Sequence, residues 1–333
     1  MSKIVLVTGG AGYIGSHTVV ELVAAGYIPV ILDDFRNSKP WILDRIKEIT
    51  GEQPIHYNVD CQDETEVFDV LKKYTKAVGL IHFSADKAVG ESVEKPVKYY
   101  QNNVGSLCAV LQVMDKLGMN NLVFSSSCTV YGEAKEPVVT EESPVQKATS
   151  PYGDTKITCE KIIKFTSDAS VNFNAALLRY FNPIGAHPTA LIGELPQGIP
   201  NNLVPYITQT AKGIREKLTV FGNDYNTADG TNVRDYIHVV DLAKAHVKAL
   251  DFLMNVSTKT CEIINLGTGK GTSVLEIIKT FESVNDVKLN YNIGPRRKGD
   301  VEQIYANAQK AKAILGWECE YSLKDALKHS WEW

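Results

Sequence analysis

The first part of the chain alternates between short apolar runs and amphipathic stretches. Ile4-Val-Leu-Val7 is a β-branched apolar run typical of a buried strand, and Thr8-Gly9-Gly10 follows it. Apolar residues then recur at helical spacing over residues 14–25, and a second apolar run covers residues 28–32 before Asp33. A strand, a glycine turn, a helix and a strand within about 30 residues predict a βαβ unit, whose right-handed crossover implies a parallel sheet.

This alternation continues to residue 180. Apolar runs predict further strands at residues 54–59, 79–83, 121–124 and 175–178. Amphipathic stretches predict helices at residues 65–74, 97–117 and 152–167. Strands that alternate with helices in this way are typical of a doubly wound α/β fold. We therefore expect a Rossmann-like parallel sheet in a first domain over residues 1–180.

The pattern becomes less regular in the second half. Residues 183–202 are rich in Pro, Gly and Asn, which predicts a loop. Helices are expected near residues 203–213, 240–254, 273–284 and 307–316. We therefore expect a smaller C-terminal α/β domain over residues 181–333, which binds the substrate and whose chain can cross back to the first domain.

Composition places the 333-residue chain among soluble globular proteins, with 44% hydrophobic and 22% charged residues. The net charge of −4 predicts no broad basic surface, so neither nucleic acid nor an anionic membrane is expected as a partner. No apolar run approaches the ~18 residues that span a bilayer, and no signal peptide is visible. Six cysteines without a CxxC pair favour reduced thiols and a cytoplasmic location. The seven histidines form no HExxH pattern, so no metal site is expected.

A glycine-rich string lies between the first predicted strand and the first predicted helix. Gly9, Gly12 and Gly15 stand at i, i+3 and i+6. The first two allow a tight turn and a close approach of the backbone to a pyrophosphate, and the third allows the helix to pack on the sheet. Asp33, at the end of the second strand, can accept hydrogen bonds from ribose hydroxyls and would repel a 2′-phosphate. Alone it is equally compatible with a solvated acid, but with the loop it predicts a dinucleotide site that prefers NAD to NADP.

Tyr152 and Lys156 stand one helical turn apart. A free tyrosine titrates near ~10, and a neighbouring Lys⁺ together with a positively charged nicotinamide lowers that pKa. Tyr152 can then accept a proton from a substrate hydroxyl. Ser127 ends a predicted strand at the sheet edge where α/β ligands bind, so it can hydrogen-bond the same oxygen. Because Tyr-x-x-x-Lys often arises by chance, the alternative is a surface pair.

These residues and the glycine-rich loop resemble the extended branch of the short-chain dehydrogenase/reductase family. Further strings resemble the UDP-glucose (UDP-galactose) 4-epimerases of that branch, and the similarity covers nearly the whole chain. These strings are Tyr13-Ile-Gly-Ser-His17, Lys87-Ala-Val-Gly-Glu-Ser92, Arg179-Tyr-Phe-Asn-Pro183, Gly198-Ile-Pro-Asn-Asn-Leu203, Phe221-Gly-Asn-Asp-Tyr225 and Arg234-Asp-Tyr-Ile-His238.

The resemblance implies an enzyme that interconverts UDP-galactose and UDP-glucose by transient oxidation at sugar C4 with bound NAD. Tyr152, Lys156 and Ser127 are then the catalytic residues. The implied NAD-binding residues are Gly9, Gly12, Tyr13, Ile14, Asp33, Asn37, Ser38, Asp60, Phe83, Lys87, Asn102, Tyr152, Lys156 and Tyr180. The implied residues for the UDP-sugar substrate are Ser127, Tyr152, Asn182, Asn202, Leu203, Phe221, Arg234, Tyr236, Arg297, Asp300 and Ile304. The resemblance further implies a homodimer formed through the helices near residues 97–117 and 152–167.

Residue chemistry agrees with this assignment. Guanidinium groups such as those of Arg234 and Arg297 match the oxygens of a diphosphate, although each arginine alone could be a surface ion-pair residue. Phe221 can stack on uracil. Sugar 4,6-dehydratases of the superfamily need an acid beside the active serine, whereas Cys128 and Thr129 follow Ser127 here, which favours epimerisation.

Several positions depart from the family pattern. Asp86 precedes Lys87 and could pair with it, which would weaken the hold of Lys87 on NAD. Leu195 stands where the family usually carries Asp. Ile304 is intermediate between the bulky Tyr and the small Cys found at this position, so we expect N-acetylated UDP-sugars to be admitted. The alternatives to a UDP-hexose 4-epimerase are another nucleotide-sugar epimerase, such as a UDP-N-acetylglucosamine 4-epimerase, a non-catalytic NAD or nucleotide-sugar sensor, and an alcohol dehydrogenase that releases NADH.

Overall fold

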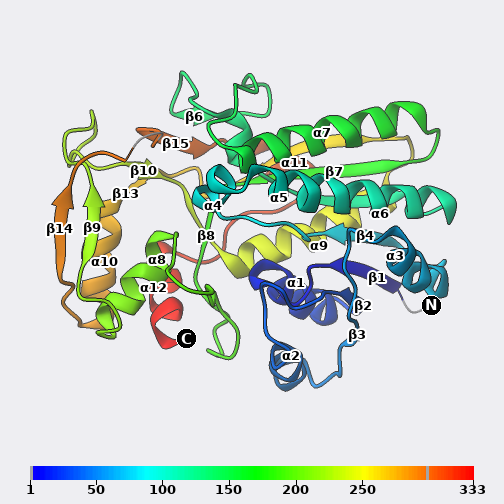
Figure 1. Cartoon of the computed structure of the whole chain (residues 1–333), viewed down its shortest axis with the longest axis horizontal. Coiled ribbons are helices and arrows are strands. Elements are labelled where there is room, and N and C mark those ends of the chain that lie inside the picture. The colour runs from blue at the N-terminus through cyan, green and yellow to red at the C-terminus, as the bar shows by residue number, and fades with distance from the viewer. Residues whose placement is uncertain (1–2, 298–299) are drawn as a thin grey trace.

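A seven-stranded parallel sheet forms the larger part of the protein (Figure 1). The computed structural model describes residues 3–297 and 300–333. The strand order is β12-β7-β5-β4-β1-β2-β3, and all neighbours pair in parallel. The strands are β1 (Lys3–Thr8), β2 (Tyr27–Leu32), β3 (Ile55–Tyr57), β4 (Gly79–His82), β5 (Asn121–Ser127), β7 (Asn174–Tyr180) and β12 (Cys261–Leu266). The predicted Rossmann-like sheet is therefore confirmed, and one of its strands, β12, comes from beyond residue 180.

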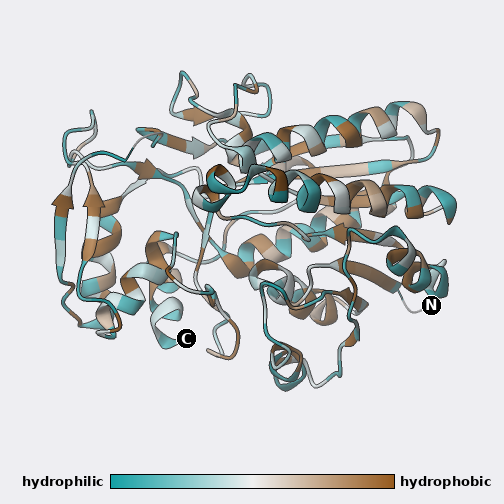
Figure 2. Ribbon diagram, in the orientation of Figure 1, coloured by the Kyte–Doolittle hydropathy of each residue, from teal (hydrophilic) through white to brown (hydrophobic). Residues whose placement is uncertain are grey.

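Helices cover both faces of this sheet, because successive side chains of each strand point to opposite faces. Val5 and Val7 pack into one core cluster, whereas Leu6 between them packs into another. The first cluster involves helices α1 (Tyr13–Ala24), α2 (Ile42–Thr50), α9 (Val239–Asn255) and α11 (Gln309–Leu315). The second involves α3 (Glu64–Leu71), α6 (Gly105–Lys116) and α7 (Pro151–Ala169). Figure 2 shows the apolar colour along the strands that these layers enclose.

The helix predicted over residues 97–117 is interrupted. It consists of α5 (Pro96–Tyr99), a π-helical turn η2 (Tyr100–Val104) and α6. A π turn adds a residue to the helical repeat, so the residues after it are rotated about the axis. Asn102 and Asn103 are buried in this turn. The short helices η1 (Lys72–Tyr74) and α4 (Val89–Glu94) precede the segment.

A smaller α/β unit lies beyond the carboxyl ends of the parallel strands (Figure 1). Its four-stranded sheet joins β6 (Val138–Val139), β10 (Val233–Arg234), β13 (Thr272–Ser273) and β15 (Gln303–Ala306). Two further strand pairs are β8 (Asn182–Ile184) with β11 (Tyr236–His238), and β9 (Leu218–Phe221) with β14 (Tyr291–Gly294). The unit also contains η3 (Cys128–Tyr131), α8 (Leu203–Ala211), α10 (Val274–Asn285) and α12 (Leu323–Glu332). Within the described ranges, no helix combines the length and the apolar character needed to cross a bilayer.

A buried ion pair joins α7 to the sheet. Arg179 on β7 donates from Nε to Oε1 of Glu160 at 2.8 Å and from Nη2 to Oε2 at 2.5 Å. Ser126 Oγ on β5 donates to the same Oε1 at 2.6 Å. Glu160 and Arg179 are 4% and 1% exposed, so neither charge has water to replace its partner. The pair therefore fixes the position of α7 along β5 and β7.

We expect Glu160→Gln to lower the free energy of unfolding by about 3–5 kcal/mol, because it leaves the buried guanidinium of Arg179 without a counter-charge. Urea unfolding measures this change. Glu318→Gln is the matched control, since Glu318 pairs with Lys312 where both side chains are 66% exposed. Such exposed pairs contribute about 0–1 kcal/mol. Equal stability of the two variants would contradict the role assigned to the buried pair.

Candidate active site

The glycine-rich loop after β1 leaves a cradle in front of α1. Gly9 has a φ of 67°, which favours glycine, and its N–H donates to the carbonyl oxygen of Leu32 at 2.8 Å. A Cβ at Gly15 would lie 2.2 Å from the carbonyl oxygen of Gly9, so a side chain there cannot be accommodated. Tyr13 begins α1, and the N–H groups of its first turn point toward the loop. This arrangement fits a pyrophosphate at a helix N-terminus.

The Asp33 carboxylate lies beside the cradle. Its Oδ2 accepts from the N–H of Ala11 at 3.0 Å, and its Oδ1 accepts from the N–H of Phe35 and from Ser38 Oγ at 2.9 and 3.2 Å. Burial raises the pKa of Asp33, and these hydrogen bonds act in the opposite direction. Asp33 and Ser38, both predicted cofactor residues, are thus brought together.

Arg36 connects two other predicted cofactor residues, and the sequence analysis did not single it out. Its Nη2 pairs with Asp60 Oδ2 at 2.6 Å and with Asp34, and its Nη1 donates to Asn102 Oδ1 at 3.0 Å. The guanidinium is therefore already neutralised by two carboxylates. This surrounding charge suits ribose hydroxyls better than a 2′-phosphate.

The expected pairing of Asp86 with Lys87 is wrong. Lys87 Nζ pairs instead with Glu194 Oε1 at 2.9 Å. Asp86 accepts from Asn37 Nδ2 at 3.1 Å and lies 3.5 Å from Lys98 Nζ. The two adjacent side chains point to opposite sides of the backbone: that of Asp86 is 4% exposed and that of Lys87 is 57% exposed.

The three predicted catalytic residues converge at the carboxyl ends of β5 and β7. Ser150 caps α7 by accepting from the N–H of Gly153 at 3.2 Å, which places Tyr152 in the first turn. Lys156 Nζ donates to the carbonyl oxygen of Ser125 at 2.7 Å and lies 5.9 Å from the centroid of the Tyr152 ring. Ser127 ends β5 in the same place. The structure therefore brings a phenol, an ammonium and a hydroxyl into one buried site.

Burial dominates the electrostatics of Tyr152 in the protein alone. Burial raises the pKa of Tyr152, and the Ser127 hydroxyl only partly opposes it. Burial also lowers the pKa of Lys156 to about 8. The protein groups by themselves therefore do not lower the pKa of Tyr152, because desolvation is the largest cause of the shift and Tyr180 adds to it.

The remaining predicted cofactor residues frame this region. Tyr180 OH and Ser125 Oγ are 2.5 Å apart. The Phe83 ring lies 4.6 Å from that of His246 on α9. Tyr13 OH donates to the carbonyl oxygen of Gly185 at 2.7 Å, and Ile14 packs against the core cluster beneath the sheet.

A second group of predicted residues lies on β8, β10, β11 and β15. Asn182 is the register partner of Tyr236, and Arg234 is the register partner of Ile304. Burial raises the pKa of Tyr236 to about 12, with Arg234 opposing this and Asp300 adding to it. Arg234 also opposes the burial that raises the pKa of Cys128 to about 12, so its charge reaches the turn after Ser127.

Three predicted substrate residues lie together at the outer end of the smaller unit. Arg297 Nη2 donates to Asp300 Oδ1 at 2.8 Å. The Arg297 Cζ lies 5.5 Å from the centroid of the Phe221 ring, which is 41% exposed. The arginine, the carboxylate and the aromatic ring thus form one polar and aromatic surface.

Asn202 and Leu203 mark the start of α8. Asn202 Nδ2 donates to Glu194 Oε1 at 2.8 Å, so it shares that oxygen with Lys87. No motif in the sequence pointed to Glu194 itself; only its neighbour Leu195 was noted, as a departure from the family pattern. No local pattern indicates the pairing with Lys87, which lies 107 residues away in the chain.

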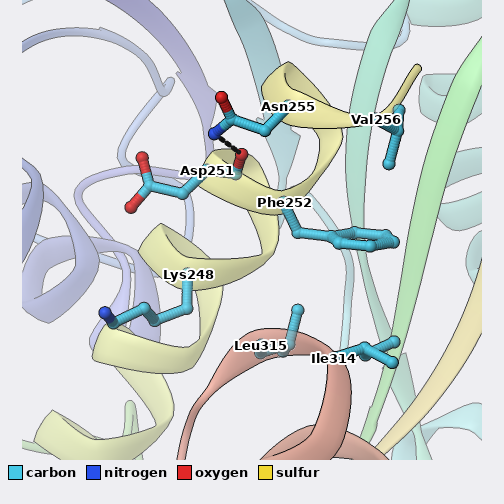
Figure 3. A pocket seen from close by; sticks show the side chains of 7 residues that line it. All are labelled: Lys248, Asp251, Phe252, Asn255, Val256, Ile314 and Leu315. Atoms are coloured by element: carbon cyan, nitrogen blue, oxygen red, sulfur yellow. Dashed lines mark hydrogen bonds between the residues drawn. The ribbon is translucent and has the colours of Figure 1, made fainter.

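A surface pocket at the C-terminal end of α9 lies apart from this site. It is lined by Asp251, Phe252 and Ile314, with four further residues drawn in Figure 3. Because α9 ends before β12 begins, the pocket lies toward the amino ends of the parallel strands. Ligands of open α/β sheets bind at the opposite edge. We therefore keep the glycine-rich loop and Tyr152 as the candidate active site.

The chain is similar over nearly its whole length to characterised proteins. Residues 6–330 match the family model described as GDP-mannose 4,6 dehydratase. A UDP-glucose 4-epimerase of Bacillus subtilis (strain 168) is 50% identical over 329 residues, which are 99% of this chain and 96% of that protein. A UDP-glucose 4-epimerase of Homo sapiens is 48% identical and covers 100% of this chain, with 97% of that protein covered.

Solved structures agree with this similarity. The UDP-glucose 4-epimerase from Bifidobacterium longum in complex with NAD+ and UDP has a TM-score of 0.95 and 45% identity, and the match covers 99% of this chain and 98% of that one. The enzyme from Stenotrophomonas maltophila, with bound NAD and formylated UDP-arabinopyranose, has a TM-score of 0.96 and 44% identity over 99% and 97% of the two chains. With this full-length identity and a common fold, the chain belongs to the UDP-glucose 4-epimerase family of the extended short-chain dehydrogenases/reductases.

Proposed function

We propose that this protein catalyses the reversible interconversion of UDP-galactose and UDP-glucose, with NAD as its cofactor. The observation that carries the proposal is the convergence of Ser127, Tyr152 and Lys156 beside the cradle of Gly9 and Gly15. The full-length relatives support it, since solved members hold NAD together with UDP or a UDP-sugar.

The residues of this site fit NAD. The cradle before α1 would take the pyrophosphate, and Asp33 would accept from the adenosine ribose. Asn37, Ser38, Asp60 and Asn102 would complete that end, while Phe83, Lys87, Lys156 and Tyr180 would face the other end of the cofactor. Bound NAD supplies the hydride acceptor and donor for the sugar carbon.

Tyr152 would move the proton of the sugar 4-hydroxyl. In the protein alone burial holds Tyr152 as a neutral phenol, so it can donate a proton to an oxygen. A positive charge close to the ring favours the phenolate and allows the opposite transfer. Lys156, with a pKa of about 8, is mostly protonated at pH 7 and contributes such a charge. Ser127 would hydrogen-bond the same sugar oxygen and orient it.

The protein would hold the substrate by its diphosphate while the sugar rotates in the site. Arg234 and Arg297 suit the phosphate oxygens, and Phe221 suits the base. Asn182, Asn202, Leu203, Tyr236 and Asp300 would complete this subsite. A 4-keto sugar formed at Tyr152 would thus stay tethered while it presents its opposite face.

Elimination chemistry is disfavoured by the turn that follows Ser127. Cys128 and Thr129 occupy the positions at which dehydratases of the superfamily carry an acid. Both residues belong to η3, which Ser127 caps by accepting from the N–H of Thr129 at 3.2 Å. The retained Tyr152 and Lys156 argue against a sensor without catalysis.

We also propose that the two parts of the chain bind different ligands. Residues 1–180, with β12 added to their sheet, would bind NAD, and the rest of residues 181–333 would bind the UDP-sugar. The six cysteines are free thiols, which is compatible with a cytoplasmic location.

We expect the purified protein to convert UDP-galactose to UDP-glucose without added NAD, in an assay coupled to UDP-glucose detection. Tyr152→Phe removes the proton carrier and should lower kcat by about 10²–10⁴-fold while UDP still binds. Tyr74→Phe is the control, because Tyr74 lies in η1, far from the site, and bonds only Tyr57 among the side chains described. Absence of conversion even with NAD added, despite UDP binding, would favour the sensor.

N-acetylated substrates test the role of Ile304. This side chain is 5% exposed and packs with Tyr131, Ile157 and Phe181. We expect UDP-N-acetylglucosamine to turn over at least weakly. Ile304→Tyr should abolish that turnover and spare UDP-galactose, while Ile304→Val should retain both. If the unaltered protein leaves UDP-N-acetylglucosamine inert while UDP-galactose turns over, the idea fails.

A homodimer through the segment near residues 97–117 (α5, η2 and α6) and through α7 is supported by exposed apolar side chains on α5, on α7 and on the neighbouring α4. Val93, Val97 and Phe165 are 63%, 66% and 73% exposed, although apolar side chains favour burial. Sedimentation should give twice the 36.7 kDa mass of one chain. Val93→Asp with Val97→Asp should yield monomers, whereas Val171→Asp, outside these helices, should not. A monomeric unaltered protein would exclude the dimer.

A further inference from the structure

The segment from Glu194 to Asn202 links residues of the two proposed ligand sets. It starts after the β-bridge between Ala186 and Gly193 and ends at the first residue before α8. Near its middle, Gln197 Nε2 donates to the carbonyl oxygen of Arg36 at 3.1 Å, in the loop after β2. The segment therefore contacts the proposed cofactor side before it enters the helix of the substrate side.

One carboxylate oxygen of this segment joins two proposed ligand residues. Glu194 Oε1 accepts from Lys87 Nζ at 2.9 Å and from Asn202 Nδ2 at 2.8 Å. Lys87 follows β4 and belongs to the proposed cofactor set, whereas Asn202 belongs to the proposed UDP-sugar set. Because both donors share one acceptor, a movement of either donor displaces the atom that holds the other.

Burial and packing fix the position of Glu194. Its side chain is 10% exposed, against 57% for Lys87, so water competes little for the carboxylate. Trp333 Nε1 donates to the backbone oxygen of Glu194 at 3.3 Å. A Cβ at Gly193 would lie 2.5 Å from the Trp333 ring, so the indole packs closely on the backbone just before Glu194. Glu194 also lies within electrostatic reach of Tyr13, whose pKa is raised by burial first and by Glu194 second.

The geometry points to Glu194 as a positioning residue that holds Lys87 and Asn202 in a common arrangement and thereby couples NAD retention to UDP binding. This inference rests on the proposed function, which assigns the two partners to the two ligands. In this role Glu194 contacts neither the sugar carbon that reacts nor the cofactor. It sets where the two donors lie when the ligands arrive.

Removal of the shared acceptor should loosen both ligands without disabling the chemistry. We expect Glu194→Ala to weaken UDP binding about tenfold, as the loss of a hydrogen bond to a charged group does. NAD release should accelerate by about threefold, less than the UDP effect because Lys87 is largely solvated. KM for UDP-galactose should rise while kcat of NAD-loaded enzyme stays near that of the unaltered protein. Glu194→Gln should be intermediate, since its amide oxygen accepts but carries no charge.

The effect of bound UDP on NAD release distinguishes this role from a merely structural one, because a residue that only stabilises the fold would not change that effect. UDP affinity is measured by calorimetry on NAD-loaded protein, and NAD release by the NAD retained after gel filtration with and without UDP. In the unaltered protein bound UDP should slow NAD release, and in Glu194→Ala this effect should disappear. Glu318→Gln, at an exposed ion pair with Lys312, should behave as the unaltered protein.

Double variants identify the partners through which Glu194 acts. Combined with Lys87→Met, Glu194→Ala should add little to the loss of NAD. Combined with Asn202→Ala, it should add little to the loss of UDP affinity. Fully additive effects in both cycles would overturn the inference.

The outcomes separate this inference from the proposed function. An unaltered protein that binds NAD and UDP but converts no UDP-galactose contradicts the proposed reaction, while the linkage measurement still stands. A converting protein whose Glu194→Ala variant keeps the UDP affinity, the NAD release and their linkage overturns the role of Glu194. If Glu194→Ala fails to fold, Glu194→Gln decides by the same measurements.

Discussion

The position of α7 against β5 and β7 is the constraint on which the site depends. The buried pair of Glu160 and Arg179 fixes the middle of the helix, and Lys156 reaches the backbone of Ser125 one turn earlier. Tyr152 then falls next to the end of β5, where Ser127 stands. A shift of one residue would rotate the phenol by about 100° around the helix axis, away from that hydroxyl. The active-site geometry is thus a consequence of helix register.

Burial shifts the pKa values of the site residues and also makes them sensitive to a charge that binds nearby. It raises the pKa of Tyr152, which stays a neutral phenol in the protein alone, and it lowers the pKa of Lys156 only to about 8, so that Lys156 stays mostly protonated at pH 7. The same low polarity makes any added positive charge act strongly on the phenol. A buried Tyr–Lys pair is therefore responsive to what binds beside it, whereas an exposed pair would be screened by water.

The smaller unit supplies groups that the parallel sheet lacks. Arg234 on β10, Phe221 on β9 and Asn182 on β8 lie beyond the carboxyl ends of the strands. The segment from Glu194 to Asn202 contacts the loop after β2 through Gln197 and Lys87 through Glu194, and it leads into α8. Such an arrangement suits a substrate that has to be held at one end while the other end turns.

Local features were readable from the sequence. The alternation of strands and helices, the glycines of the loop and the one-turn spacing of Tyr152 and Lys156 depend on residues close together in the chain, whose steric and periodic rules are general. The tertiary structure alone decided which distant groups meet. Lys87 pairs with Glu194, which is 107 residues away, and not with its neighbour Asp86. The raised pKa of Tyr152 likewise depends on how completely other segments exclude water from it. Pairing and desolvation are products of packing, and no short stretch of sequence encodes the packing of the segments that surround it.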